Sequence, residues 1–104
     1  MLGIFLDTET TGLNPKKHTI IEISYRIIDL VTSEEKNSFH SILKVSKETF
    51  LKADPNSLQV NGFSFEETEK GLDEEAVKKT ITSTFTSLDI VRSKAVFIYQ
   101  NPSF

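Results

Sequence analysis

Three β-strand patterns follow one another between Gly3 and Val45, and only short segments join them. Residues 3–8 contain a run of apolar side chains, which is typical of a strand buried on both faces. From Thr19 to Asp29 and again from Ser38 to Val45, apolar residues recur at every second position. Connections this short favour an antiparallel meander, so the first half of the chain is expected to form three antiparallel strands.

The second of these segments separates its side chains into two sets. Alternation along a strand sends neighbouring residues to opposite faces of a sheet. One face is therefore expected to carry Ile21, Ile23, Tyr25 and Ile27, and the other Glu22, Ser24 and Arg26. The apolar set predicts a packed core on one side of the sheet.

The pattern changes after Val45. Residues 46–62 combine turn signals with a short segment of helical character, and from Asp73 to Leu88 apolar residues recur at helical spacing. The apolar stretch 94–101 follows this helix, so it can return parallel to an earlier strand. The sequence thus predicts one α/β domain over residues 1–104, with a mixed sheet of three antiparallel strands, then a helix and a parallel strand. Such a sheet needs a further helix to cover it, so the C-terminal part of the fold is expected to be missing.

Composition limits the classes of function. The chain has no cysteine, which excludes disulfides and thiolate metal sites and favours a reducing cytoplasm. No apolar run is long enough to span a membrane, so no membrane partner is expected. The net charge is −3 and the pI is about 5.3, so there is no overall basic character to attract nucleic acid. A nucleic-acid partner would need a local contact mediated by a metal ion.

Two acids end the first strand pattern, in the stretch FLDTETTGLNP. Asp7 and Glu9 are two residues apart, so on a strand their carboxylates point to the same side. Like charges at this distance repel unless a proton or a cation compensates them. Mg²⁺ and Mn²⁺ prefer carboxylate and water oxygens and leave positions open for substrate phosphates. The pair is therefore a candidate metal site, although two acids at a solvated strand end would give the same bare pattern.

Four segments, taken in order, resemble the DEDD 3′–5′ exonucleases, the family of the proofreading subunit of bacterial replicative polymerase, ribonuclease T and oligoribonuclease. GIFLDTETTGLNP resembles the first exonuclease motif, and HTIIEISY at 18–25 resembles the family's second strand. DPNSLQVNG at 54–62 is similar to the D-P-x-x-x-x-V-H-G segment. IYQNPSF at 98–104 is similar to the beginning of the second motif.

The resemblance implies a ribonuclease H-like fold and two-metal hydrolysis of phosphodiester bonds at single-stranded DNA or RNA 3′ ends, with Mg²⁺ or Mn²⁺. Asp7 would bridge the two ions, and Glu9 would hold the ion that activates water. Leu13 would wedge against the terminal base, or alternatively pack the turn onto the sheet. The implied substrate-binding residues are Thr10, Thr11, Gly12, Leu13, Asn61, Asn101 and Phe104, with Asn61 standing where many relatives have His.

The resemblance is also incomplete. The Asp of the second motif would follow Phe104, and the third motif, with its acid and its His or Tyr base, has no counterpart. The 104-residue chain is therefore expected to be inactive or nearly so. The alternative is a non-catalytic remnant of the fold with a packing or binding role. The substrate sugar, and whether the protein works alone or on a DNA polymerase, stay open.

Other interpretations fit the residues less well. Haloacid dehalogenase-like phosphatases need Asp where Glu9 stands, and actin-like phosphate loops need Gly there. His18 and His40 lack the neighbouring acids and histidines of a metal triad, so both are expected to be ordinary surface or core residues. The apolar last strand, from Ala95 to Tyr99, is expected to leave a sheet edge exposed and so to promote self-association.

Overall fold

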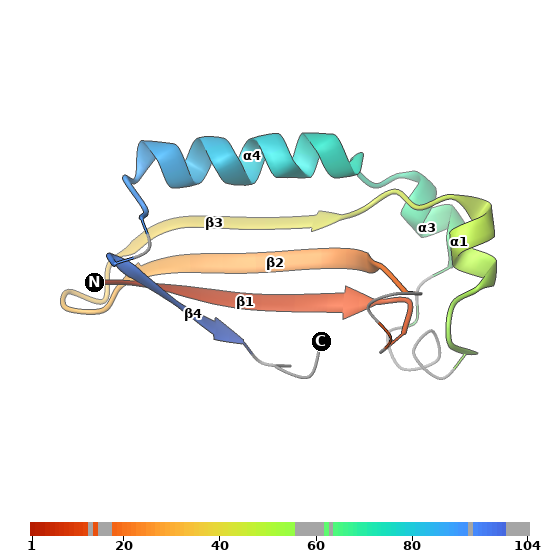
Figure 1. The fold of residues 1–104 in the computed structure, drawn as a ribbon, viewed down its shortest axis with the longest axis horizontal. Coiled ribbons are helices and arrows are strands. Elements are labelled where there is room, and N and C mark those ends of the chain that lie inside the picture. The colour runs from red at the N-terminus through yellow and green to blue at the C-terminus, as the bar shows by residue number, and fades with distance from the viewer. Residues whose placement is uncertain (13, 15–17, 56–61, 63, 92, 100–104) are drawn as a thin grey trace.

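A computed structural model of the protein describes residues 1–12, 14, 18–55, 62, 64–91 and 93–99. Its strands form one sheet in the order β3-β2-β1-β4 (Figure 1). β1 (Leu2–Thr10) is antiparallel to β2 (Ile20–Asp29), and β2 is antiparallel to β3 (Glu35–Ile42). β4 (Ala95–Tyr99) runs parallel to β1. The predicted mixed α/β sheet is confirmed.

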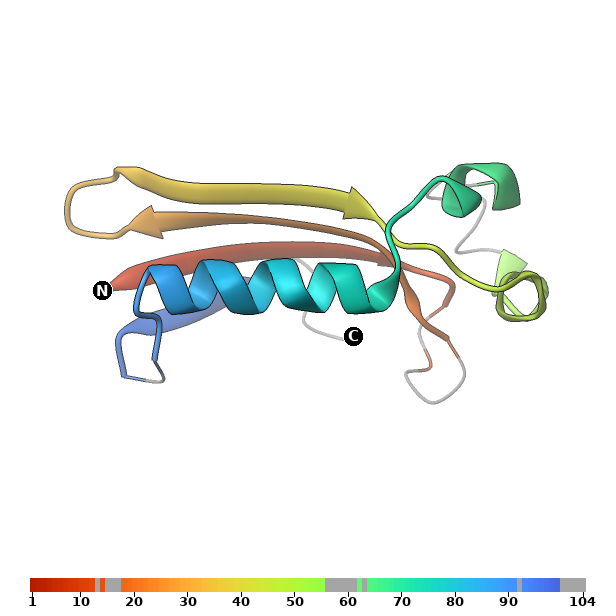
Figure 2. The ribbon, with the colours of Figure 1, turned by 90° about the horizontal axis from the view of Figure 1, so that it is seen from above.

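Within the described residues, three helices lie in the connection between β3 and β4. α4 (Glu74–Ser87) runs along one face of the sheet, in the segment where helical spacing predicts a helix (Figures 1 and 2). α1 (Lys47–Leu51) and α3 (Phe65–Glu69) lie beyond the end of the sheet. None of the helices in the described ranges is long and apolar enough to cross a membrane.

The core lies between the sheet and α4. Ile4, Tyr25 and Ile27 are buried at its centre. Partly buried side chains from the sheet, the helix and the segment after it complete this cluster, namely Leu2, Leu6, Phe39, Ile81, Phe85, Leu88, Ile90 and Ala95. The predicted apolar face of the second strand is therefore the core face. In the part of the chain that the structure describes, no helix covers the opposite face, which is called the open face below (Figure 1).

The third strand begins and ends three residues earlier than its apolar pattern predicts, at 35–42 instead of 38–45. The turn before it is tight because the Asp29 carboxylate accepts hydrogen bonds from the Val31 and Thr32 N–H groups, at 2.8 and 3.2 Å. Pairing with β2 can therefore resume at Glu35. After β3, the Leu43 N–H still donates to the Ile21 carbonyl of β2 at 2.8 Å, and Leu43 forms an isolated bridge with Leu72. The apolar pattern contains neither the turn hydrogen bonds before this strand nor the bridge that follows it.

Tyr25 provides a test of the core. Its ring packs against Phe39 and Phe85, but within the described residues its hydroxyl is buried and has no hydrogen-bond partner. A buried polar group without a partner costs about 1–3 kcal/mol. We expect Tyr25→Phe to leave the free energy of unfolding unchanged or to raise it by about 1 kcal/mol, measured by urea denaturation. A loss of stability would mean that the hydroxyl makes a hydrogen bond in solution.

Candidate active site

The register between β1 and β2 fixes where the two acids lie. Asp7 is paired with Ser24, and Glu9 with Glu22. Directly paired residues share a face, and both pairs lie opposite the face that carries Ile4 and Tyr25. Asp7 and Glu9 therefore lie together on the open face, towards the end of β1. The register shifts between Glu9 and Thr10, which marks an irregularity of the kind often found beside functional sites.

A hollow of about 320 Å³ adjoins Asp7 on the open face. Its walls combine apolar side chains from three neighbouring strands with a few polar groups, and the residues are Phe5, Leu6, Asp7, Ser24, Arg26, Ile28 and Ile98. The Arg26 Nε lies 2.7 Å from the Glu35 carboxylate, so this cation is already paired. The hollow can therefore take an apolar group beside one carboxylate.

The surroundings of Glu9 raise the pKa of its carboxyl group. Partial burial raises the pKa of its carboxyl group, and the negative charges of Asp7 and Glu22 raise it further. Glu22 in turn lies 2.6 Å from the His40 Nε2 on the neighbouring strand. Three carboxylates and one imidazole thus follow one another across the open face.

This donor set fits an open site for a hard cation. Mg²⁺ is usually held by one or two carboxylates together with water and substrate phosphates. Asp7 and Glu9 supply two carboxylates, and a cation between them would relieve the repulsion that raises the pKa of Glu9. Among the described residues, no three His, Asp or Glu side chains converge closely enough to enclose an ion. A cation between Asp7 and Glu9 would therefore need further ligands.

The turn after β1 is held by its own hydrogen bonds. Thr11 is fully buried, and its N–H donates to the Thr19 carbonyl at 2.9 Å while its Oγ1 accepts from the Thr19 N–H at 3.0 Å. The Thr11 carbonyl accepts from the Asp54 N–H at 2.6 Å. The Thr10 hydroxyl donates to the Gly12 carbonyl at 2.7 Å. The N–H and carbonyl groups of Thr11 are thus both used in hydrogen bonds that hold the turn in place.

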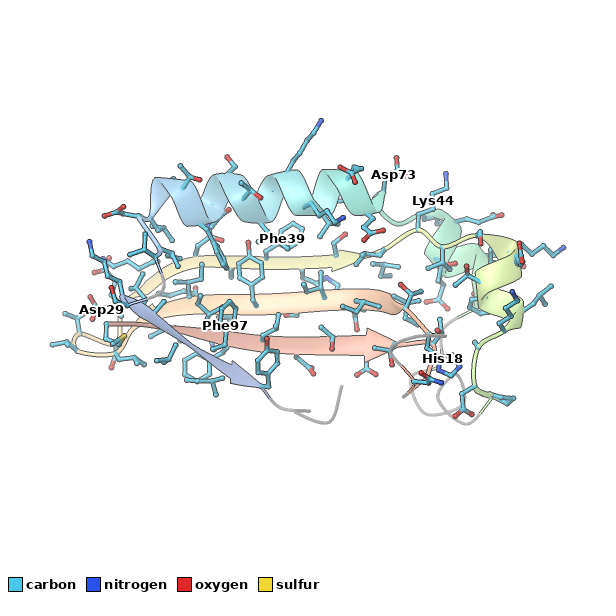
Figure 3. The ribbon with its side chains drawn as sticks, viewed as in Figure 1. His18, Asp29, Phe39, Lys44, Asp73 and Phe97 are labelled. Carbon is cyan, nitrogen blue, oxygen red and sulfur yellow. The ribbon has the colours of Figure 1, made fainter. Side chains whose placement is uncertain are left out.

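Gly12 lies against the side chain of His18. A side chain there would overlap the His18 ring, whose Cγ is only 2.6 Å from the position of a Cβ. The His18 Nδ1 accepts a hydrogen bond from the Asn14 N–H at 3.2 Å, and the His18 N–H donates to the Asn14 carbonyl. Figure 3 shows His18 at the loop end of the sheet, near the end of β1. This histidine therefore closes the turn.

Several predicted substrate contacts lie outside the described residues. They are Leu13, Asn61, Asn101 and Phe104. Conversely, periodicity alone did not associate Glu22 and His40 with the site. The sequence did place Glu22 on the polar face of the second strand. That Glu22 lies beside Glu9 follows only from the register of the two strands.

Comparison with known proteins identifies the family. The sequence profile of the RNase T family, described as exonuclease, matches residues 4–102. The chain belongs to this exonuclease family. No curated protein matches the sequence. The resemblance to DEDD exonucleases that the motifs predict is therefore confirmed at the level of the family.

Solved structures of nucleases share this exonuclease fold. The nuclease domain of 3′hExo bound to rAMP, described as a DEDDh family member, has a TM-score of 0.72 at 16% identity, and the match covers 96% of this chain and 52% of that domain. Cell-death related nuclease 4 (CRN-4) has a TM-score of 0.73 at 16% identity, covering 96% of this chain and 35% of the other. Escherichia coli exonuclease I with a dT13 oligonucleotide has a TM-score of 0.75 at 18% identity, with coverages of 94% and 20%. The chain thus spans about half or less of the length of these nucleases, and its fold is the ribonuclease H-like exonuclease fold.

Because the pKa of Glu9 is raised, replacing it with a neutral residue should increase the stability of the fold in a pH-dependent way. Because folding raises the pKa of this carboxyl group above 4.5, its ionisation at neutral pH destabilises the folded state. Glu9→Gln should therefore raise the melting temperature at pH 7 by about 2 °C, and the difference should disappear well below pH 4.5, where Glu9 is protonated in both states. Thermal unfolding followed by circular dichroism measures both values. Glu69→Gln, an exposed change on α3, is the control, and a lower melting temperature for Glu9→Gln at pH 7 would contradict the expectation.

The contact between Gly12 and His18 predicts coupled effects. Gly12→Ala should lower the free energy of unfolding by about 1–3 kcal/mol, because the new methyl group displaces the imidazole. In Gly12→Ala/His18→Ala the methyl group has space, so the double variant should lose less stability than the two single variants together, by about 0.5–2 kcal/mol. A double-mutant cycle in urea measures this coupling. Strict additivity would show that the two side chains do not contact each other.

Proposed function

We propose that this domain is built for 3′–5′ exonuclease action on single-stranded DNA or RNA ends, with Mg²⁺ or Mn²⁺ held by Asp7 and Glu9, although the 104-residue chain alone lacks the groups needed for turnover. The observation that carries this proposal is the shared position of the two carboxylates on the open face, in a chain whose residues 4–102 match an exonuclease family. The substrate class is supported by the similar structures, since exonuclease I is bound to a DNA oligonucleotide and 3′hExo to a ribonucleotide. Together these two leave the choice of sugar open.

The two acids have different environments and hence different roles. Asp7 is exposed beside the hollow, so its carboxylate is free to approach a substrate phosphate together with its counter-ion. Glu9 is partly buried and repelled by its neighbours, so a positive charge in the site favours its ionised form. When bound, a pair of divalent ions supplies polarisation of the phosphate and a nucleophilic water in this kind of reaction. Thr10, Gly12 and the neighbouring turn would position the terminal nucleotide.

The carboxylate count limits what this chain does alone. Among the described residues, Asp7 and Glu9 do not belong to any group of three acidic or histidine side chains that could hold a metal ion. Two carboxylates compensate two divalent ions only partly, so further acids and a base are needed for turnover. We therefore propose that the 104-residue chain binds a divalent ion weakly and is catalytically inactive or nearly so. A polymerase partner remains a prediction of the motif resemblance.

Two assays on the 104-residue chain test this proposal. In isothermal titration with Mn²⁺, the wild type should bind with a dissociation constant on the order of 1 mM, and Asp7→Ala should weaken binding at least about tenfold because one of two ligands is lost. Incubation of a 5′-labelled single-stranded oligonucleotide with Mn²⁺ should give no shortening above that of Asp7→Ala. Glu66→Ala, on the distant helix α3, is the matched control for both assays.

The outcomes of these assays separate the two parts of the proposal. Equal Mn²⁺ binding by the wild type and Asp7→Ala would contradict the metal site. Stepwise shortening from the 3′ end that Asp7→Ala abolishes would support the exonuclease function and show that the chain needs no further groups.

A further inference from the structure

His18 bonds to both backbone groups of Asn14. The His18 N–H donates to the Asn14 carbonyl at 2.7 Å, and the Asn14 N–H donates to the His18 Nδ1 at 3.2 Å. The imidazole also fills the space that a side chain on Gly12 would need. One ring therefore contacts two separate positions of the turn after β1, at the loop end of the sheet (Figure 3).

The residue after His18 anchors this ring to the sheet. The Thr19 N–H donates to the Thr11 Oγ1 at 3.0 Å, and the Thr19 carbonyl accepts from the Thr11 N–H at 2.9 Å. Thr11 is fully buried, so these two bonds have a rigid support. The bonds of Thr19 do not depend on pH, whereas the bond from Asn14 to the imidazole depends on the charge of a side chain.

The direction of the bond from Asn14 determines the protonation of the ring. A backbone N–H can only donate, so the His18 Nδ1 presents its lone pair. The imidazole is therefore neutral and carries its proton on Nε2. Protonation would place a second N–H on Nδ1, opposite the Asn14 N–H, and two donors cannot bond to each other. The contact with Asn14 thus exists only while His18 is neutral.

The charges around the ring leave this contact as the first one that protonation affects. The charged residues of the segments that adjoin His18 are Glu9 on β1, Asp54 after α1, and Lys16 and Lys17 before it in the sequence. Among the described residues, no ion pair includes His18. The neighbouring charges that raise the pKa of Glu9 are those of Asp7 and Glu22.

We propose that neutral His18 is a positioning residue for the turn that carries Thr10 and Gly12, and that protonation of His18 releases this turn. The inference rests on the proposed function, in which Thr10 and Gly12 position the terminal nucleotide. The Thr10 hydroxyl donates to the Gly12 carbonyl at 2.7 Å, so a displacement of Gly12 also reaches Thr10. Histidines change charge between about pH 5 and 8. Binding of a nucleic-acid end should therefore weaken in this range through His18, separately from the protonation of Asp7 and Glu9.

A direct contact between His18 and the substrate predicts the opposite pH dependence. An imidazolium next to a phosphate would strengthen binding at low pH, because it adds a positive charge. A positioning role weakens binding at low pH, because the turn loses its support. The sign of the effect thus separates the two roles.

Two substitutions of similar shape isolate the acceptor of His18. Asn and Leu both branch at Cγ, but only Asn places an oxygen where His has Nδ1, and this oxygen accepts a hydrogen bond without titrating. His18→Asn should therefore keep the contact with Asn14 at every pH, and His18→Leu should lose it at every pH. Thr32→Val is the matched control, since it removes a side-chain acceptor for the Glu34 N–H from the turn between β2 and β3.

Nuclear magnetic resonance of the 104-residue chain, without metal or nucleotide, tests the contact itself. Long-range ¹H–¹⁵N spectra should show the proton of neutral His18 on Nε2, and the Asn14 amide signal should move with the same pH midpoint as the His18 ring. In His18→Asn this transition of the Asn14 amide should be absent. The opposite tautomer, or an Asn14 amide that does not follow the ring, overturns the proposal.

Titration with a thymidine trinucleotide in excess Mg²⁺, followed by the same spectra, tests the consequence for binding. From pH 7.5 to 5.5 the dissociation constant should rise by a factor at least about threefold larger for the wild type than for His18→Asn, which has the same metal ligands. At pH 7.5 His18→Leu should bind at least about threefold more weakly than His18→Asn, and Thr32→Val should match the wild type.

The outcomes distinguish this proposal from the proposed function. Equal pH dependence of the wild type and His18→Asn overturns the positioning role, and so does tighter binding by the wild type at pH 5.5. A wild type that binds no trinucleotide at pH 7.5 contradicts the nucleotide contacts of the turn, while the spectra without nucleotide still decide whether His18 holds it. Circular dichroism establishes that each variant is folded, and if His18→Leu is not, the comparison with His18→Asn decides alone.

Discussion

The antiparallel register between β1 and β2 determines what the open face carries. It pairs Asp7 with Ser24 and Glu9 with Glu22, while the alternate residue Ile4 is buried against α4. Because side chains alternate strictly along a strand, a slip of β1 by one residue would exchange its two faces. Both carboxylates would then enter the core. Burying an unpaired charge costs much more free energy than a single local contact contributes. The packing of the core thus sets the position of the acids, although no acid takes part in it.

The same constraint creates an electrostatic cost. In the unfolded chain Asp7, Glu9 and Glu22 are free to separate in water, whereas the folded sheet holds them along one line and partly buries Glu9. The fully buried Ile27 and its neighbours in the core provide the burial that offsets this repulsion. If a cation binds between Asp7 and Glu9, as proposed above, it would relieve this repulsion, so the arrangement that lowers the stability of the fold would favour binding. Such opposition between stability and function is common at functional sites.

Sequence patterns predicted those features of the fold that depend on local periodicity. The faces of β2 and the extent of α4 follow from alternation and helical spacing, so both were predictable. The start of β3 depends on the hydrogen bonds of Asp29 within a turn, and an apolar pattern does not contain that information. The helix α3 was not predicted, although Ser64 and Glu67 form a capping box that marks its start in the sequence. The proximity of Glu22 to Glu9 was not predictable from periodicity, because it requires the register of two strands.

The structure also separates two kinds of residue within the motif that follows β1. Thr11 and Gly12 have sufficient packing reasons to be what they are, because one bonds to Thr19 and the other lies against His18. A turn of this shape would need them without any nucleotide, so their presence is weak support for a substrate contact. Nothing in the fold requires Asp7 or Glu9, and the fold would be more stable if Glu9 were neutral. Residues that the packing does not explain and that carry a cost to stability are the ones whose presence calls for a functional reason. The case for function therefore depends on the two acids and not on the turn beside them.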